Sequence, residues 1–422
     1  MPSTQACTTT GTSTDTCTST AAHFSLNAFR GCHGADVEHP LYQAHLAYMG
    51  VRSLRIHSWN MLKDARAHHG GWLDVAHKRW DREAVARCCE AWQHYTGELI
   101  INIPGWPVWL QQRGDVLAPA HWDDTAAWYA ELVDLVVNTH GLQVAWWEAT
   151  NEFDQGWIVA PRARGEADHA ADMAALYTRC SRAMRAAGAT QVGGPAFTRP
   201  DQLDNVAGFI DTCREHCDVL SVHAYGCGSA DTPDRDLFAR PAVIAASLAD
   251  IRAMLNQRGL HDLPLHLNEF NVAWTWDSLD PRMPDHRGAC FDAAMACCCI
   301  PSGVQAMMAW NECDGVYGKM DGAYRLRPAG HWYHLANRHC IGEWTTLPSA
   351  DGLHAAQVAG DARTSLVLVN TTDQVASAPK AADSASGAEY WRIDENGFTR
   401  LGPAASAGWK LLPRHSITVA VW

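Results

Sequence analysis

Short apolar runs and longer amphipathic stretches alternate along most of the chain, from residue 22 to about residue 345. Each short run has the composition and the turn-forming borders of a buried β-strand. Eight such runs follow one another, and this order restricts the fold to parallel arrangements of strands joined by helices. The runs are His23 to Gly31, Arg52 to Trp59, Leu99 to Gly105, Val144 to Asn151, Gln191 to Ala196, Val219 to Tyr225, Pro264 to Phe270 and Val304 to Trp310.

The stretches between these runs have apolar residues at helical spacing and are long enough to cross back over a sheet. Eight strand and helix units in a row close most simply into a (β/α)8 TIM barrel, in which the reactive groups lie at the C-terminal strand ends. The clearest helical stretches are Arg82 to Tyr95, Thr125 to Asn138, Ala170 to Ala187, Pro241 to Arg258 and Arg287 to Cys299.

The pattern changes after a helix predicted at 330–338, where short strand-like segments alternate with Gly, Asp and Ser turns. We therefore predict a disordered Ser/Thr-rich tail at 1–21, the barrel at 22–345 and an accessory β-sandwich at 346–422. We expect the sandwich to brace the barrel, and strands that follow the tail to complete it. The segments are Leu353 to Val358, Thr364 to Asn370, Glu389 to Asp394 and His415 to Trp422.

Composition limits the classes of partner. The chain is 47% hydrophobic and 19% charged, as in ordinary globular proteins, and its formal net charge is −13. This charge argues against nucleic acid or an acidic membrane surface as a partner. Residues 1–20 have no basic start or apolar run, and no window of 18 apolar residues occurs elsewhere, so we expect neither a signal peptide nor a membrane span.

The 15 cysteines are irregularly spaced and include Cys88-Cys89 and the triplet at 297–299, which we interpret as small buried hydrophobic residues. An odd count without a disulfide pattern favours a reducing compartment, and hence the cytoplasm. Cys7 and Cys17 in the tail could pair if the protein were exported. The sequence leaves the oligomeric state open, including a homo-oligomer.

Two predicted strands, the fourth and the seventh, each lead to a glutamate. Glu152 ends the segment that begins at Trp147, and Glu269 lies in the segment Leu265 to Phe270. The ends of strands four and seven face each other across the mouth of an eight-stranded barrel. A retaining glycosidase needs two carboxyl groups on opposite sides of the anomeric carbon, one to protonate the leaving oxygen and one to attack.

These strand ends resemble glycoside hydrolases of clan A: Asn151-Glu152 closes strand four, and 268–271 (Asn-Glu-Phe-Asn) closes strand seven. Further motifs resemble glycoside hydrolase family 39, which holds β-xylosidases, α-L-iduronidases and bacterial exopolysaccharide hydrolases. The resemblance covers about residues 22 to 345. The further motifs are 192–196 (Val-Gly-Gly-Pro-Ala) on strand five, 221–225 (Ser-Val-His-Ala-Tyr) on strand six and 55–57 (Arg-Ile-His) on strand two.

The resemblance implies that Glu152 is the general acid and base and that Glu269 is the nucleophile. Glu152 must hold its proton near neutral pH, which burial would favour, whereas Glu269 must stay ionised beside donors. Asn151 would bind the hydroxyl next to the anomeric carbon. Four more residues complete the predicted centre as partners of Glu269 or of the sugar: Arg55, His57, His223 and Tyr225.

The sequence has 19 tryptophans, and those near strand ends can form stacking faces for sugar rings, whereas Trp80, Trp92 and Trp128 on helices are expected in the core. We expect Trp310 to form the floor of the sugar subsite and Trp106 and Trp109 to form a wall. The other strand-end tryptophans are Trp59, Trp147 and Trp274.

Three further acids stand near the predicted site. We expect Glu312 and Asp314, in the loop after strand eight, to bind sugar hydroxyls. Glu148 lies four residues before Glu152, so we place it deeper in the barrel, paired with an interior base. Lys319 stands where we expect acids in β-xylosidases, and it could favour a charged sugar.

These observations predict a retaining glycoside hydrolase that cleaves an equatorial bond without a metal or cofactor and acts from the chain end on xylo- or arabino-configured oligosaccharides. One alternative is an endo-acting hydrolase of a bacterial exopolysaccharide. An alternative of another class is a non-catalytic carbohydrate-binding protein on a hydrolase scaffold.

Overall fold

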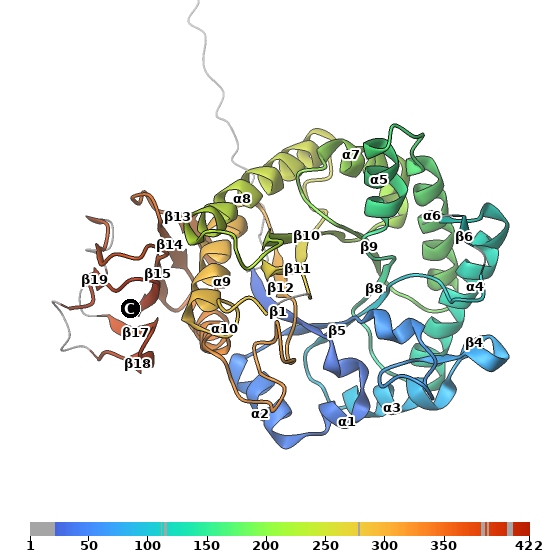
Figure 1. Cartoon of the computed structure of the whole chain (residues 1–422), viewed down its shortest axis with the longest axis horizontal. Coiled ribbons are helices and arrows are strands. Elements are labelled where there is room, and N and C mark those ends of the chain that lie inside the picture. The colour runs from blue at the N-terminus through green and yellow to red at the C-terminus, as the bar shows by residue number, and fades with distance from the viewer. Residues whose placement is uncertain are drawn as a thin grey trace, which may run out of the picture.

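A closed barrel of eight parallel strands forms the centre of the molecule in the computed structural model (Figure 1). The structure describes residues 22–110, 112–113, 116–276, 279–380, 385, 388–402 and 408–422, so the predicted tail with Cys7 and Cys17 lies outside it. Each of the eight predicted runs overlaps one barrel strand, and β10 and β11 extend two and three residues beyond the predicted ends. The strands are β1 (His23–Ala28), β2 (Ser53–Ile56), β5 (Glu98–Ile103), β8 (Trp146–Ala149), β9 (Val192–Phe197), β10 (Leu220–Cys227), β11 (Leu265–Ala273) and β12 (Ala306–Ala309).

Each barrel strand pairs with its neighbours in chain order, and β12 closes the ring against β1. All of these pairings are parallel, so every strand ends at the same face of the barrel. The fold class predicted from the sequence is therefore confirmed, and the two glutamates lie at one end of the barrel.

Helices surround the barrel on the outside, as Figure 1 shows. All five predicted helical stretches are confirmed, and the helix predicted at 330–338 is α10. Short strand pairs lie in the loops: β3 (Leu73–Asp74) with β4 (Arg79–Trp80), and β6 (Gln112–Arg113) with β7 (Val116–Leu117). The helices are α1 (Gly34–Val37), α2 (Pro40–Met49), α3 (Arg82–Trp92), α4 (Trp122–Val133), α5 (Ala160–Ala163), α6 (Ala170–Ala186), α7 (Leu203–Cys213), α8 (Asp234–Gln257), α9 (His286–Cys299) and α10 (Pro328–His339).

Local signals explain several helix ends. Asp81 and Asp285 precede α3 and α9, and their carboxylates accept from the backbone amides of Ala84 and Arg287. α8 begins at Asp234, seven residues before the predicted start, and Pro241 lies inside it. The Asp234 carboxylate is ion-paired with Arg282 at 3.1 Å, which anchors the additional first turns.

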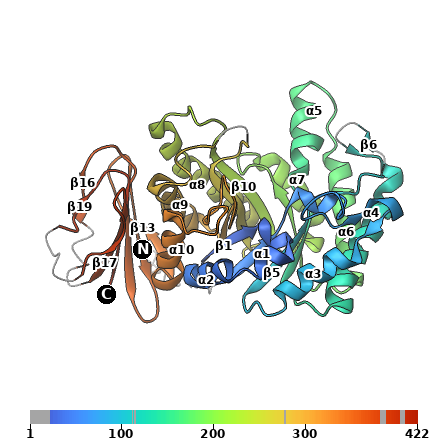
Figure 2. The same ribbon diagram turned by 60° about the horizontal axis from the view of Figure 1, so that its bottom comes forward.

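The chain ends in a six-stranded antiparallel sheet that packs beside α9 and α10 (Figures 1 and 2). A small pair of strands, β16 and β19, accompanies it, consistent with a β-sandwich. β13 lies partly inside the region assigned to the barrel, and β1 is a barrel strand, so the first described strand does not complete the sandwich. The strands are β13 (Glu343–Thr346), β14 (Leu353–Ala359), β15 (Thr364–Asn370), β16 (Ala376–Ser377), β17 (Glu389–Asp394), β18 (Gly397–Arg400), β19 (Leu411–Leu412) and β20 (Ser416–Val421).

The two faces of this sheet belong to two different apolar clusters. Val367, Val369 and Val419 pack into the same cluster as the barrel and its helices. Leu366, Leu368 and neighbouring residues on the opposite face pack with Trp409 and Leu412. Because side chains alternate along a strand, β15 supplies apolar residues to both clusters.

The cysteines in the described residues are all free thiols, and most of them are buried. Cys88, Cys89, Cys297 and Cys299 are buried in helices, as predicted, and burial raises the pKa of each thiol. Cys298, the third member of the predicted triplet, is only half-buried. No helix in the described part of the chain combines the length and the apolar character needed to span a membrane.

Candidate active site

A cavity of about 840 Å³ opens at the C-terminal end of the barrel. Both predicted catalytic glutamates line it, together with Asn151, His57 and Tyr225. These residues come from the ends of four different strands, which explains why residues far apart in the sequence lie side by side.

The two carboxyl groups lie close together around His223. One oxygen of Glu152, one oxygen of Glu269 and one ring nitrogen of His223 all lie within 4.8 Å of one another. The Glu269 side chain is 9% exposed, whereas that of Glu152 is 31% exposed. We expected the Glu152 side chain to be buried, but the Glu269 side chain is the more buried of the two.

Glu269 is held by two charged or polar donors. The Tyr225 hydroxyl donates to Oε1 over 2.6 Å, and Arg55 Nη1 donates to Oε2 over 3.3 Å. Burial and then the charge of Glu269 raise the pKa of Tyr225 well above its usual value, so the phenol keeps its proton and remains a donor. Both contacts fix the orientation of the Glu269 carboxyl group.

Arg55 connects this carboxylate to the interior of the barrel. It is fully buried and donates to Glu148 at 2.6 Å, to Asn27 at 2.7 Å and to Asn151 at 2.6 Å. Glu148 thus lies below the cavity and pairs with an interior base, as predicted. Arg55 does not line the cavity. It therefore positions Glu269 and the Asn151 side chain from beneath.

Glu152 is bound to His223 rather than to an arginine. His223 Nδ1 and Glu152 Oε1 are 2.8 Å apart, and His223 Nε2 lies 3.8 Å from Glu269. Burial lowers the pKa of His223, but the negative charges of Glu269 and Glu152 outweigh it, so the pKa is raised. His223, which we expected to donate to Glu269, is therefore principally a partner of Glu152.

The backbone also directs Glu152 toward the cavity. Thr150 and Glu152 have φ values of 72° and 57°, in the left-handed region that side chains rarely adopt. Such a residue costs about 1–3 kcal/mol, and strain of this kind is concentrated at functional sites. The Glu152 amide donates to the Ala196 carbonyl over 2.9 Å, which ties this turn to β9.

His57 lines the cavity with its ring held from below. Its Nδ1 lies 2.8 Å from Asn102 Oδ1, and its ring centroid is 5.3 Å from that of Trp310. Burial, followed by the charge of Arg55, lowers the pKa of His57 well below its usual value, so the ring is neutral. A neutral ring fixed at Nδ1 presents Nε2 for a hydroxyl of a ligand.

The aromatic lining differs from the predicted one. Trp310 lines the cavity, as do Trp59 and Trp274 from the strand-end group and Trp276, which the sequence did not indicate. Trp59, Trp274 and Trp276 are 50%, 63% and 54% exposed. These exposed indoles surround a cavity whose floor holds the two carboxylates.

Trp106 and Trp109 do not line the cavity, contrary to the prediction that they form its wall. Trp106 packs against Phe153 and Trp157, and Trp109 packs against the main core. Trp147 is fully buried, and so are the helical residues Trp80 and Trp92. An indole near a strand end can point outward from the barrel, so position along the chain does not decide its role.

Glu312 does not line the cavity, where the sequence led us to expect it to bind a sugar hydroxyl. Its side chain is fully buried and accepts from the amides of Phe29 and Gly31 at 2.8 and 3.0 Å and from the Tyr42 hydroxyl at 3.1 Å. Burial raises its pKa to about 7. Glu312 therefore fastens the loop after β1, which carries the cavity residue Phe29.

The prediction for Asp314 is wrong for a similar reason. Its carboxylate accepts from Asn311 Nδ2 and from the amides of Val316 and Gly318, each at 2.8 Å. Lys319 is also buried, 2.6 Å from the Asp292 carboxylate, and cannot reach a charged sugar. Asp314 and Lys319 therefore stabilise the conformation of this loop through buried polar contacts.

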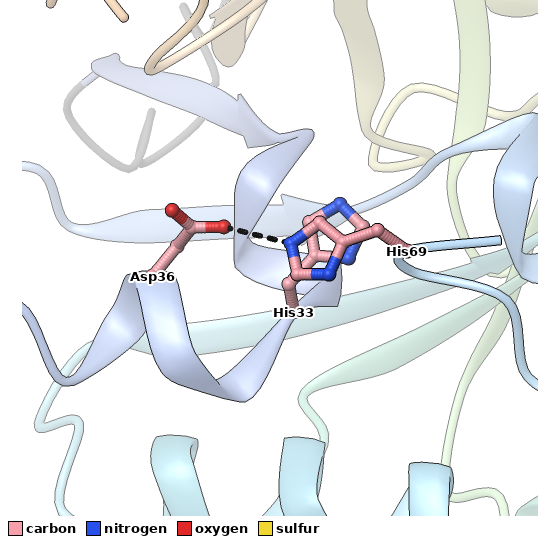
Figure 3. Close-up of side chains that lie close together, drawn as sticks. All are labelled: His33, Asp36 and His69. Atoms are coloured by element: carbon pink, nitrogen blue, oxygen red, sulfur yellow. Dashed lines mark hydrogen bonds and ion pairs between the residues drawn. The ribbon is translucent and has the colours of Figure 1, made fainter. Parts of the chain in front are cut away.

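A second cluster lies where the loops after β1 and β2 meet. His33, Asp36 and His69 approach one another there (Figure 3). The two rings stack at 4.0 Å with an angle of 14°, so their ring-plane lone pairs are nearly parallel and do not converge on one point. Asp36 also accepts from Arg30 and Tyr324. This geometry fits a contact between two loops better than a metal centre.

Sequence reasoning missed several residues of the cavity that lie on loops and on α8 beyond the strand ends. They are Phe29, Gln155, Thr198, Arg199 and Arg240. Phe29 and Thr198 directly follow β1 and β9, so the rule that strand ends form the site could have indicated them. Arg240 lies within α8, far from a strand end, and only the packed structure shows that it lines the cavity.

The comparisons with known proteins agree on the fold. No protein-family model matches the sequence, and no curated protein matches it. Similar solved structures include a 4-O-α-L-rhamnosyl-β-D-glucuronidase from Fusarium oxysporum, with 12% identity, coverage of 96% of this chain and 97% of that one, and a TM-score of 0.66. A family 51 α-L-arabinofuranosidase from Bifidobacterium longum is 14% identical, with coverage of 96% of this chain and 97% of that one and a TM-score of 0.62. A family 30 endoxylanase from Clostridium papyrosolvens is 13% identical, with coverage of 96% of this chain and 97% of that one and a TM-score of 0.61.

These structural neighbours are glycoside hydrolases. At such low identity the likeness establishes the shared fold, and the activity of this chain has to be argued from its own site. The resemblance to family 39 stays a prediction, since the neighbours named above carry other family designations or none.

Proposed function

We propose that the protein is a glycoside hydrolase that cleaves an equatorial glycosidic bond with retention of configuration. The observation that carries this proposal is the approach of the Glu152 and Glu269 oxygens to within 4.8 Å. Retaining enzymes hold their two carboxyl groups about 5–5.5 Å apart, whereas inverting enzymes leave about 6.5–9.5 Å for a water molecule, and a close approach of two carboxyl oxygens favours the shorter separation.

In the first step Glu269 attacks the anomeric carbon while Glu152 gives its proton to the leaving oxygen. The bond to the leaving group breaks, and a glycosyl ester forms on Glu269. In the second step Glu152, now ionised, takes a proton from water, the water oxygen attacks the anomeric carbon, and the ester bond to Glu269 breaks. The Asn151 Oδ1 atom accepts from Arg55, and in this proposal the Asn151 amide group donates to the hydroxyl beside the reacting carbon.

The substrate class follows from the neutral polar groups around the carboxylates and from the activities of the structural neighbours. We assign xylo- or arabino-configured oligosaccharides cleaved from the chain end as the first candidate, since the neighbours include a xylanase and an arabinofuranosidase. One observation favours the endo-acting alternative: Trp59, Trp274 and Trp276 are exposed at the cavity and can stack on sugar rings beyond the reacting one.

A trapping experiment tests the mechanism. Incubation with a panel of activated 2-deoxy-2-fluoro glycosides should add one glycosyl mass to the protein, on the peptide that contains Glu269. Glu269→Gln should take up no label and Glu152→Gln should lose most turnover, while Glu166→Gln, at an exposed surface acid, should behave as the wild type. A label on another peptide, or full turnover by either active-site variant, contradicts the proposal.

Product sizes then separate the two modes of cleavage. A defined xylo-oligosaccharide should release single sugars from one end if the enzyme acts from the chain end, and shorter oligosaccharides if it acts internally. Binding of such oligosaccharides without any turnover or labelling would support the non-catalytic alternative.

A further inference from the structure

Two arginines line the catalytic cavity, and nothing in the proposed mechanism uses them. Arg199 follows β9, and Arg240 lies in α8, which follows β10. Both side chains are exposed. Among the residues that the structure describes, Arg199 pairs with Asp201 alone, at 3.2 Å, and each member of the pair is 53% exposed. Arg240 makes no ion pair with any residue in the described ranges.

The order of the strands shows which part of a substrate these arginines face. The leaving group must lie beside Glu152, because Glu152 protonates the leaving oxygen. Glu152 follows β8, and the next strands around the barrel are β9 and β10, whose loop and helix carry the two arginines. The opposite wall comes from β1, β2 and β12. The arginines therefore stand on the arc between Glu152 and Glu269, on the same side of the cavity as the acid that the leaving oxygen must reach.

The loop that carries Arg199 is fixed relative to the catalytic acid. Asp154, two residues after Glu152, accepts from the Thr198 amide at 3.0 Å and from the Thr198 hydroxyl at 2.9 Å. Asp154 is buried, so this contact is shielded from water. These hydrogen bonds thus fix the backbone next to Arg199 relative to the backbone next to Glu152.

Trp274 adds an apolar face on the same side. A Cβ atom at Gly228, just after β10, would lie 2.7 Å from the Trp274 indole nitrogen, so the glycine leaves the space that the ring occupies. The indole is 63% exposed and borders the cavity. A sugar ring can stack on this face while its substituents reach the nearby wall.

We propose that this side of the cavity is a subsite for an acidic sugar, with the ring on Trp274 and the carboxylate of a uronic acid unit bound by Arg240 and Arg199. A guanidinium group binds a carboxylate through two parallel hydrogen bonds, which a neutral hydroxyl cannot match. The chain as a whole has a net charge of −13, so attraction of an anion must come from local cations such as these. This inference rests on the proposed function and specifies the leaving group.

The test uses two pairs of aryl glycosides that differ in one charge. The 4-carboxyphenyl and 4-carbamoylphenyl β-D-xylosides, and the same pair of α-L-arabinofuranosides, place a carboxylate or an amide in the leaving group. The measured quantity is the ratio of kcat/KM for the acid to kcat/KM for the amide. The chemical difference between the two leaving groups cancels when variants are compared with the wild type.

Arg240→Gln should lower this ratio by about fivefold, and the double variant with Arg199→Gln by about tenfold or more, mainly through KM for the acid. Raising the NaCl concentration from about 20 mM to about 500 mM should lower the wild-type ratio as well. Arg235→Gln is the matched control, because Arg235 lies in the same helix and is 88% exposed but does not line the cavity.

An unchanged ratio in the double variant, or an equal fall in Arg235→Gln, overturns the subsite while leaving the glycosidase assignment in place. If the wild type turns over neither pair and takes up no label at Glu269, the proposed function fails. Binding of the same probes, followed by tryptophan fluorescence, then decides the inference: equal affinity for acid and amide contradicts it, and tighter binding of the acid that Arg240→Gln removes supports it.

Discussion

At the scale of single residues, the orientation of Glu269, the proposed nucleophile, depends on a few directed hydrogen bonds. Glu269 receives one from a phenol that cannot ionise at working pH and one from an arginine that is held on three sides. Each donor comes from a different strand end. Loss of a donor therefore changes the charge distribution at the reacting atom without removing the reacting group.

Tyr225→Phe removes the hydroxyl that donates to Glu269 over 2.6 Å. We expect kcat to fall by roughly 100-fold, because a donor aimed at a reacting oxygen contributes about this much in comparable sites, while KM changes little. Steady-state kinetics with an aryl glycoside measure the effect. Tyr95→Phe is the control, because the Tyr95 hydroxyl donates to the Val51 carbonyl, far from the cavity. Equal kcat values for the two variants would contradict this role.

Residues of one type differ in how well their roles can be predicted from sequence. Glu152 and Glu269 were placed in one cavity by a rule of topology, since all strand ends of a parallel barrel meet at one face. Glu312 stands at an equally suggestive position after β12, yet its carboxylate binds two amides of the loop after β1. Which acid satisfies which buried amide depends on packed loop geometry, and no local pattern encodes that.

At the scale of elements, the segment between β12 and α10 is held by buried polar contacts. Lys319 lies 2.6 Å from Asp292 of α9, and both side chains are nearly inaccessible to water. Arg327 Nη1 donates to the carbonyls of Val316 and Gly318. This network fixes the loop that continues the strand leading to Trp310, so the cavity floor is coupled to helix packing.

Lys319→Met should lower the free energy of unfolding by about 3–5 kcal/mol, because it leaves the Asp292 carboxyl group buried without its cation. Adding Asp292→Leu should restore most of the loss, since both charged groups are then absent. Urea denaturation measures both effects. Arg325→Gln breaks the exposed pair with Asp321 and should cost less than about 1 kcal/mol. A Lys319→Met variant as stable as this control would refute the argument.

The long elements of the fold were predictable and the short ones were not. The eight barrel strands and six helices (α3, α4, α6, α8, α9 and α10) carry apolar periodicity over several residues and were predicted, whereas α2 and α7 were not among the predicted stretches. β16 and β19 have two residues each, which is too few to show any period. They pair with each other across more than 30 residues of intervening chain, so no local pattern indicates them. The start of α8 was misplaced because Pro241 looks like a first-turn residue, whereas Asp234 anchors the true start.

At the scale of the whole molecule, the barrel and the C-terminal sheet share one apolar cluster. α9 is buried on almost all sides, and it contacts β14, β15, β17 and β20 as well as β11. Figure 2 shows the sheet standing directly beside the barrel helices. The two domains are therefore expected to unfold together.

A chain that ends after residue 342 should fail to form a stable barrel. Removal of the sheet would expose apolar faces of α9 and α10 that now pack against Val367, Val369 and Val419. Each fully buried side chain of this kind contributes about 1.5–3 kcal/mol, so the loss of these three contacts alone is comparable with the stability of a typical domain, about 5–15 kcal/mol. Soluble yield and calorimetry of the shortened and full chains measure this, and a shortened chain with an unchanged melting temperature would contradict it.

Acid should destabilise the molecule because several buried histidines are neutral in the folded state. Burial lowers the pKa of His23 and His33 to about 4 and that of His266 to about 3, below the unfolded value of 6.5. The unfolded chain therefore binds more protons between about pH 6.5 and pH 4, and this contribution to stability, complete above pH 6.5, is lost as the pH falls. Glu312, with a pKa raised to about 7, acts in the opposite direction over part of this range.

His266 isolates the effect, since its ring is buried and its Nδ1 has no partner among the described residues. Around pH 5 one extra proton on the unfolded state changes the free energy of unfolding by about 1.4 kcal/mol per pH unit. His266→Gln should reduce the pH slope by about this amount between pH 4 and pH 6, as urea denaturation at several pH values would show. The same substitution at exposed His68 controls for the loss of a histidine. If both variants keep the wild-type slope, the buried histidines do not cause the loss of stability in acid.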